Sequence, residues 1–267
     1  MTTSCISILG SGWLGLPLAA ELVKQGYSVN LSTKTATKLT QLTDIGADAY
    51  LIDIEQMKGS STFFNCSTLI INITSKNITA YQQLIRQVEQ SPVKHVLFVS
   101  SSSVYLTNNR LVNESEQAEN PDSPLYQIER LFVQNKHFDT TILRFSGLIG
   151  YNRHPGRFFK KNNLIKDPDA PVNLIHSDDF VGIIKAIIKH NYWGETLNGC
   201  SDSHPSKREF YSYARSLLGL APPRFSSTPE TTYKIVSNDK VKQQLNYQFI
   251  YPNLMTIPFE KNRENHG

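Results

Sequence analysis

The residues best suited to chemistry are a tyrosine and an arginine one helical turn apart, with a serine run before them. Tyr126 and Arg130 stand at positions i and i+4, which puts the phenol and the guanidinium on one face of a predicted helix. Ser101 stands 25 residues before Tyr126, at the end of an apolar β-type run. A phenol beside a strand-end hydroxyl is suited to general acid–base work. We expect Tyr126 to move a proton on a substrate oxygen, with Ser101 polarising that oxygen and Ser102 contacting the substrate.

The arginine is expected to make the tyrosine more acidic. An ordinary tyrosine has a pKa of about 10, so reaching about 7 needs roughly 4 kcal/mol. A fixed cation about 4 Å away supplies about 4 kcal/mol at an effective dielectric constant of about 20. Arg130 can therefore supply the electrostatic part, but a guanidinium keeps its proton near neutrality and cannot relay one. The plainer interpretation is an exposed tyrosine and arginine on a solvated helix.

Three glycines near the N-terminus separate a β-type run from an amphipathic stretch. The run is Cys5–Leu9, and the stretch ends at Gly26. The first glycine permits a tight turn, the second lets backbone N–H groups approach a phosphate, and the third lets the helix pack close to the strand. The pattern predicts a dinucleotide pyrophosphate site, whereas the alternative is an ordinary tight turn. The expected contacts are Gly10, Gly12, Trp13, Leu14 and Gly15.

The end of the second predicted strand, V-N-L-S-T-K-T, bears on which dinucleotide binds. Sites that prefer NAD usually place an acidic residue here, but the chain has no carboxylate between Val29 and Asp44. Hydroxyls and an ammonium suit a 2′-phosphate, because a charge-assisted hydrogen bond is worth roughly 1.5–3 kcal/mol. We therefore expect NADP(H) to be favoured over NAD(H); the alternative is a polar turn that merely lacks an acid. The expected contacts are Ser32, Thr33 and Lys34.

Apolar β-type runs alternate with helical stretches along much of the chain. After the first strand, strands are predicted at residues 27–32, 49–54, 67–73, 94–100 and 140–145, and helices at 77–90 and 124–137. Near-continuous apolar strands joined by helices predict an α/β fold with a Rossmann-type, doubly wound parallel sheet. We expect residues 1–150 to form the dinucleotide-binding domain, with 172–200 returning to it. Residues 151–171 and 201–267 are then a small substrate-binding lobe.

Two stretches interrupt the alternation. Residues 107–124 form a long polar connection, expected to be a surface loop or the rim of an active site. A basic group follows the strand at 140–145 and consists of Arg153, Arg157, Lys160 and Lys161. We expect Arg153 and Arg157 to contact the substrate, because guanidinium groups can clamp a phosphate or diphosphate such as that of a nucleotide-sugar. The alternative is a solvated surface.

Composition excludes several other classes of function. The 267 residues carry a net charge of +4 from 27 basic and 23 acidic side chains, which is too balanced to indicate a nucleic-acid partner. We find no basic leader and no apolar run that could span a bilayer, so we expect a cytoplasmic protein without a membrane partner. The cysteines and histidines lack ligand spacing, and no metal site is predicted.

The spacing of Ser101 and Tyr126, together with the glycine turn, resembles the extended short-chain dehydrogenase/reductases of the NAD-dependent epimerase/dehydratase family. The likeness covers about residues 4–220 and includes the segments R-F-S-G-L-I-G and H-S-D-D-F-V. It implies an NAD(P)-dependent oxidoreductase or epimerase in which Ser101 is the catalytic hydroxyl and Tyr126 the proton-transferring residue.

The same resemblance assigns further residues. Asp53, followed by Ile54, stands where relatives hold the adenine, and helices 77–90 and 124–137 would form a homodimer surface. Arg130 departs from the family, because relatives carry a lysine there that binds the nicotinamide ribose and lowers the pKa of the tyrosine.

Two functions of different classes stay open. The first is an NADP-dependent oxidoreductase or epimerase/dehydratase-like enzyme that acts on a carbonyl or secondary alcohol of a small molecule. The second is a catalytically impaired NADP-binding sensor of the same fold. This alternative stays open because Arg130 replaces the lysine of the family. A β-hydroxyacid-type dehydrogenase shares the glycine pattern but leaves the spacing of Ser101 and Tyr126 unexplained.

Overall fold

The protein is described by a computed structural model that covers residues 4–56, 61–159, 164–227 and 232–259. The chain forms two compact units. The first comprises the described residues within 1–104, 119–144 and 184–197, and the second those within 105–118, 145–183 and 198–267. The predicted division, with residues 151–171 and 201–267 as a substrate-binding lobe, stays a prediction.

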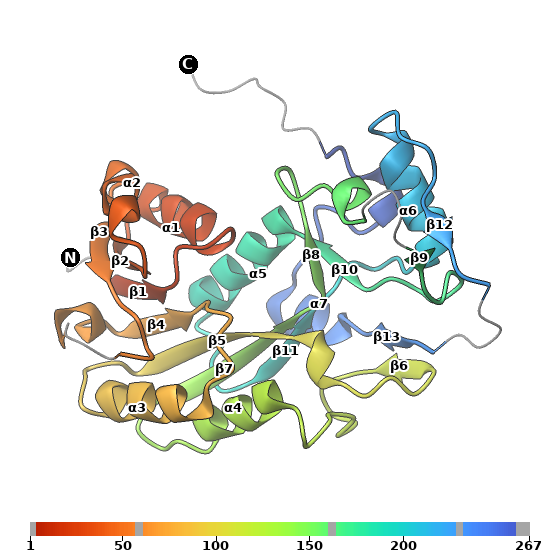
Figure 1. Cartoon of the computed structure of the whole chain (residues 1–267). Helices are drawn as coiled ribbons and strands as arrows, with labels where there is room; N and C mark the ends of the chain where they lie inside the picture. The colour runs from red at the N-terminus through yellow and green to blue at the C-terminus, as the bar shows by residue number, and fades with distance from the viewer. Residues whose placement is uncertain (1–3, 57–60, 160–163, 228–231, 260–267) are drawn as a thin grey trace. The chain divides into compact units, whose positions relative to one another are not determined.

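A seven-stranded sheet forms the centre of the first unit, in the order β11-β7-β5-β4-β1-β2-β3 (Figure 1). Its strands are β1 Cys5–Leu9, β2 Ser28–Thr33, β3 Asp48–Leu51, β4 Thr68–Ile71, β5 His95–Ser101, β7 Asp139–Phe145 and β11 Thr196–Gly199. β1 pairs in parallel with β2 and with β4, β2 with β3, and β4 with β5. The predicted Rossmann-type sheet is confirmed. The strand order reverses between β1 and β4, and open α/β sheets bind ligands at the carboxyl ends of the strands at such a point.

Helices cover both faces of this sheet (Figure 1). They are α1 Gly15–Lys24, α2 Leu39–Asp44, α3 Ile78–Glu89, α4 Pro124–Val133 and α5 Ser177–His190. Side chains cap two of them, because Asn77 accepts from the N–H of Ala80 in α3 and Ser123 from that of Tyr126 in α4. α3 and α4 pack together, and their buried faces meet the sheet around Tyr81 and Phe132. A homodimer through these helices stays a prediction.

In the described residues, the second unit contains short paired strands, the beginning of α5 and two further helices. Its parallel pairs are β6 Arg110–Val112 with β13 Lys234–Val236, β8 Gly147–Ile149 with β10 Leu174–His176, and β9 Leu164–Ile165 with β12 Arg224–Phe225. The helices are α6 Lys207–Ser216, which begins at a capping box of Ser206 and Glu209, and α7 Asp239–Leu245. The polar connection at 107–124 therefore contains a short strand, β6, in addition to irregular segments.

The carboxylate of Asp179 anchors the segment that follows α7. Asp179 is fully buried and accepts hydrogen bonds from the Tyr247 hydroxyl and from the N–H groups of Ile250 and Tyr251. Burial nevertheless raises the pKa of this carboxyl above its ordinary value. These contacts give Asp179 a structural role, because they hold the segment after α7 against the start of α5.

Candidate functional site

The glycine turn between β1 and α1 has the close contacts that only glycine allows. Gly10 has a φ of +108°, and a Cβ atom added there would lie 2.4 Å from the carbonyl oxygen of Asn72. A Cβ atom on Gly15 would lie 1.9 Å from the carbonyl oxygen of Gly10, so the helix begins directly against the turn. Gly12 has no atom within 4 Å of such a Cβ position. Neighbouring backbone therefore packs against the turn at Gly10 and Gly15, whereas Gly12 faces solvent.

Hydroxyl groups at the end of β2 hold the glycine turn and the backbone that follows β2. The Ser32 hydroxyl accepts a hydrogen bond of 2.9 Å from the N–H of Gly10. The neighbouring Thr33 hydroxyl accepts one of 3.2 Å from the N–H of Thr35. Both side chains are buried: Ser32 holds the glycine turn, and Thr33 holds the backbone directly after β2. Each hydroxyl keeps a proton that it can donate to a ligand.

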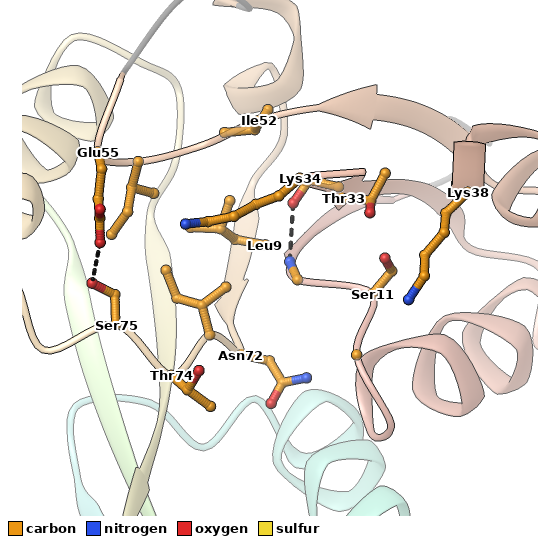
Figure 2. A pocket seen from close by; sticks show the side chains of 15 residues that line it. Leu9, Ser11, Thr33, Lys34, Lys38, Ile52, Glu55, Asn72, Thr74 and Ser75 are labelled. Atoms are coloured by element: carbon orange, nitrogen blue, oxygen red, sulfur yellow. Dashed lines mark hydrogen bonds between the residues drawn. The ribbon is translucent and has the colours of Figure 1, made fainter. Parts of the chain in front are cut away.

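A cleft of about 470 Å³ opens above the turn, at the carboxyl ends of the strands on both sides of the reversal (Figure 2). Main-chain and side-chain atoms from the ends of β1, β2, β3 and β4 line it. The lining residues are Leu9, Gly10, Ser11, Gly12, Ser32, Thr33, Lys34, Lys38, Ile52, Ile54, Glu55, Asn72, Ile73, Thr74 and Ser75. The cleft therefore lies at the kind of position where open α/β sheets bind ligands.

The residues predicted to bind the cofactor and the residues that line the cleft are in part the same. The predicted cofactor residues that line it are Gly10, Gly12, Ser32, Thr33, Lys34 and Ile54. Those that do not stand among its described lining residues are Trp13, Leu14, Gly15 and Asp53. The lining residues that the prediction did not name are Leu9, Ser11, Lys38, Ile52, Glu55 and the segment Asn72 to Ser75. A signal for that segment was available, because it follows β4, the strand that must neighbour β1 in such a sheet.

Charge is distributed unevenly around the cleft. The ammonium of Lys34 lies 2.9 Å from a carboxylate oxygen of Asp53, and that oxygen also accepts from the N–H of Glu55 at 3.0 Å. The N–H of Glu55 and, after it, Lys34 lower the pKa of the Asp53 carboxyl. The Lys34 side chain extends toward the side of the cleft where the Glu55 carboxylate accepts a hydrogen bond from the Ser75 hydroxyl, whereas Lys38 supplies a second cation on the opposite side (Figure 2).

The predicted catalytic residues lie at the end of β5 and on α4. Ser101 is the last residue of β5, and its hydroxyl accepts a hydrogen bond of 3.1 Å from the N–H of Ser103. Ser102 follows it in a short 3₁₀ turn and is buried. Tyr126 is half-buried in the first turn of α4, and Arg130 is exposed one turn later. The half-buried tyrosine and the exposed arginine therefore lie on the same helix, one turn apart.

A buried cation, which sequence reasoning missed, lies against the Tyr126 ring. The guanidinium carbon of Arg144 is 5.9 Å from the centre of that ring. Arg144 is 3% exposed and binds the carboxylate of Glu129 through Nε at 3.1 Å and Nη2 at 2.6 Å. It also contacts Glu119, and Glu129 accepts a further hydrogen bond from the Ser100 hydroxyl. Burial raises the pKa of Glu129, while Arg144 opposes that rise.

The predicted substrate residues belong to the second unit. Arg153 donates from Nε to the carbonyl oxygen of Leu148 at 2.8 Å, and its guanidinium carbon lies 5.2 Å from the centre of the Phe158 ring. Arg157 is exposed at the end of the 3₁₀ turn Pro155–Arg157, which packs tightly on α6 through Gly156. Lys160 and Lys161, also named from the sequence, lie outside the described residues.

The described residues form neither a metal centre nor a membrane-spanning helix. Within the described residues, no group of three or more histidine, cysteine or carboxylate side chains is arranged to hold a metal ion. No helix in the described parts of the chain combines the length and apolar character needed to cross a bilayer.

Comparison with known proteins agrees with this geometry. Residues 10–172, more than half of the chain, match the NAD(P)H-binding family. Protein YeeZ of Escherichia coli (strain K12) is 28% identical over 272 residues, which cover 96% of this chain and 99% of that protein.

Solved structures share the fold at lower identity. A conserved protein of unknown function from Silicibacter pomeroyi superposes with a TM-score of 0.79 at 20% identity, covering 95% of this chain and 96% of that one. A short-chain dehydrogenase/reductase superfamily protein from Agrobacterium tumefaciens with bound NAD gives 0.76 at 17% identity, covering 92% and 93%. The UDP-glucuronic acid 4-epimerase from Bacillus cereus in complex with NAD gives 0.75 at 18%, covering 94% and 95%.

The glycine turn, the cleft at the strand reversal and the match over residues 10–172 lead to one conclusion. The chain belongs to the NAD(P)H-binding family and has the fold of the extended short-chain dehydrogenase/reductases, which include NAD-dependent epimerases and dehydratases.

Proposed function

We propose that the chain is an NADP(H)-dependent oxidoreductase or epimerase that acts on a carbonyl or secondary alcohol. The observation that carries the proposal is the cleft above the glycine turn, which is lined by Lys34, directly after β2, and by Lys38, at the end of the 3₁₀ turn Ala36–Lys38. A dinucleotide fits these residues, because Gly10 and Gly15 are packed too closely for a side chain and Gly12 leaves the backbone open to a phosphate. The nicotinamide, when bound, supplies the hydride chemistry.

The end of β2 supports NADP(H) over NAD(H). Lys34 and Lys38 line the cleft where NAD-specific sites usually carry a carboxylate. Asp53 neutralises Lys34 in part, whereas no ion pair of Lys38 is recorded in the described residues. The two lysines together would bind a 2′-phosphate, while a ribose hydroxyl would gain little from either charge.

Tyr126 and Ser101 would act on the substrate oxygen. The half-buried phenol of Tyr126 would give its proton to that oxygen or take one from it, and the Ser101 hydroxyl would donate a hydrogen bond to it. Arg130 would supply positive charge along the same helix face but would not relay protons. In the second unit, Arg153 and Arg157 would bind a phosphate or diphosphate on the substrate. The structural similarity to the UDP-glucuronic acid 4-epimerase from Bacillus cereus supports this substrate class.

One observation favours a second function. Arg130 is exposed and replaces the lysine of the family, so the cofactor ribose and the phenol would have lost their usual shared partner. A sensor of NADP(H) without turnover would keep the cleft intact and tolerate this change. The enzyme is our first proposal, because Tyr126 and the strand-end serine are both retained.

Removal of the two lysines tests the cofactor preference. We expect Lys34→Ala and Lys38→Ala each to raise the Kd for NADPH about tenfold or more, because each removes a charge-assisted contact to the 2′-phosphate. The Kd for NADH should stay within about threefold in both variants. Fluorescence titration of each variant with both cofactors measures this. Equal affinity of the wild type for both cofactors, with neither variant changing it, would contradict the preference.

Two substitutions on α4 separate the enzyme from the sensor. Turnover of NADPH against a panel of carbonyls and nucleotide-sugars should fall by about 100-fold or more in Tyr126→Phe, because general acid–base catalysis contributes about 100- to 10,000-fold. The Kd for NADPH should barely change. If the wild type binds NADPH but turns over no substrate of the panel, and Arg130→Lys restores none, the sensor becomes the better proposal.

A further inference from the structure

The buried carboxylate of Glu129 joins the strand and the helix that carry the two proposed catalytic residues. Glu129 stands three residues after Tyr126, so that both lie on one face of α4. Its carboxylate accepts a hydrogen bond from the hydroxyl of Ser100 on β5, and Ser101 is the next residue of that strand. This contact therefore connects the strand end that carries Ser101 with the helix turn that carries Tyr126.

The same carboxylate fixes the cation that lies against the Tyr126 ring. Arg144 on β7 donates to the two oxygens of Glu129 from Nε at 3.1 Å and from Nη2 at 2.6 Å. Such a bidentate pair sets the direction of a guanidinium as well as its distance. The guanidinium carbon then lies 5.9 Å from the centre of the Tyr126 ring, within the range of a cation–π contact. Glu129 therefore acts on Tyr126 through the helix and through the ring.

Stability alone does not account for this group of charges. The side chains of Arg144, Glu129 and Glu119 are 9% exposed or less. Apolar side chains of similar volume often stabilise such a place equally well or better, because burying charges costs free energy. They cannot supply hydrogen bonds, which restrict both distance and angle. Arg130 is exposed, so the buried Arg144 is the better placed of the two arginines to restrict the ring.

We propose that Glu129 is a positioning residue for the proposed reaction, and that it sets the geometry between the Tyr126 phenol and the Ser101 hydroxyl through Ser100 and Arg144. The inference rests on the proposed function, in which both hydroxyls meet one substrate oxygen. A displacement of about 1 Å in such a site can lower the rate about 100-fold. Glu129 has this effect without touching substrate or cofactor.

A double-mutant cycle on turnover tests this role. In Glu129→Gln the amide NH2 would face a guanidinium N–H, so the bidentate pair is lost. We expect turnover of NADPH against the panel of carbonyls and nucleotide-sugars to fall about tenfold or more, while the Kd for NADPH stays within about threefold. In the Tyr126→Phe background the same change should lower the remaining turnover about twofold or less, because Glu129 acts through the phenol.

A milder pair of variants gives a readout that does not depend on turnover. Ser100→Ala removes one donor to Glu129 and leaves Arg144 and Tyr126 in place, so the variant should fold. We expect the NMR signal of the Tyr126 ring, identified by its absence from Tyr126→Phe, to shift in cofactor-free Ser100→Ala. Ser103→Ala is the matched control, because the Ser103 side chain is exposed on the turn after β5, and it should leave the signal unchanged.

Each measurement can overturn the inference. Equal losses of turnover from Glu129→Gln in the wild-type and Tyr126→Phe backgrounds would mean that Glu129 is merely structural. A Tyr126 signal that does not move in Ser100→Ala, or that moves as far in Ser103→Ala, would mean that the contact with β5 does not reach the ring. A wild type that binds NADPH without turnover would instead overturn the proposed enzyme, and the NMR comparison would still decide whether Glu129 holds the ring.

Discussion

Replacing Gly15 by alanine is expected to raise the Kd for NADPH about 100-fold or more and to destabilise the first unit. The added methyl group would lie 1.9 Å from the carbonyl oxygen of Gly10, and backbone cannot yield as a flexible side chain does. Helix α1 must then move away from β1, which opens the turn. Overpacking of this kind costs about 1–3 kcal/mol of folding free energy. Displaced N–H donors would lose charge-assisted bonds worth about 1.5–3 kcal/mol each.

Gly12→Ala is the control that separates binding from folding. Its Cβ atom would have no neighbour within 4 Å, so the stability against urea should match that of the wild type within about 0.5 kcal/mol. The Kd for NADPH should still rise, because the methyl group would occupy the open side of the turn. Urea unfolding and fluorescence titration of both variants provide the comparison. Binding of NADPH by Gly15→Ala within threefold of the wild type would show that the turn does not hold the cofactor.

The elements that sequence patterns predict well are those with long uninterrupted apolar runs. The runs at residues 67–73 and 94–100 correspond to β4 and β5, because a strand buried on both faces admits few polar residues. β6 could not be found in this way. Arg110–Val112 lies within a polar stretch and becomes a strand only by pairing with Lys234–Val236, more than a hundred residues later.

The candidate site was predictable where local sterics determine it. Gly10 and Gly15 follow from a strand that turns directly into a helix, and that arrangement leaves a signature in adjacent residues. The contact of Lys34 with Asp53 depends on the register of β2 against β3, which a single sequence does not state. Glu129 looks like an ordinary helix-surface residue in the sequence, although it is 2% exposed.

Replacing Arg144 by methionine is expected to lower the free energy of unfolding by about 3–5 kcal/mol, because it leaves buried carboxylates without a cation. Glu129 and Glu119 both bind this guanidinium, and Glu129 has Ser100 as its other donor. Urea unfolding at pH 7 measures the loss. The double variant Arg144→Met with Glu129→Gln should recover part of the stability, so the two changes should not add. A loss below about 1 kcal/mol in Arg144→Met would contradict the importance of the network.

The pH dependence of the Arg144→Met variant gives an independent check. Burial already raises the pKa of Glu129, and removal of Arg144 removes the main cause that opposes the rise. A carboxyl whose pKa is higher in the folded than in the unfolded protein adds stability at low pH and loses it as the pH rises through the folded pKa. The deficit of Arg144→Met relative to the wild type should therefore shrink as the pH falls from 7 to 5. Arg144 also lies against the Tyr126 ring, so the same variant should loosen that ring. We expect the NMR signal of Tyr126 to shift in Arg144→Met. The signal can be assigned by its loss in Tyr126→Phe. A deficit that grows toward pH 5 would mean that Glu129 is not the group left unpaired.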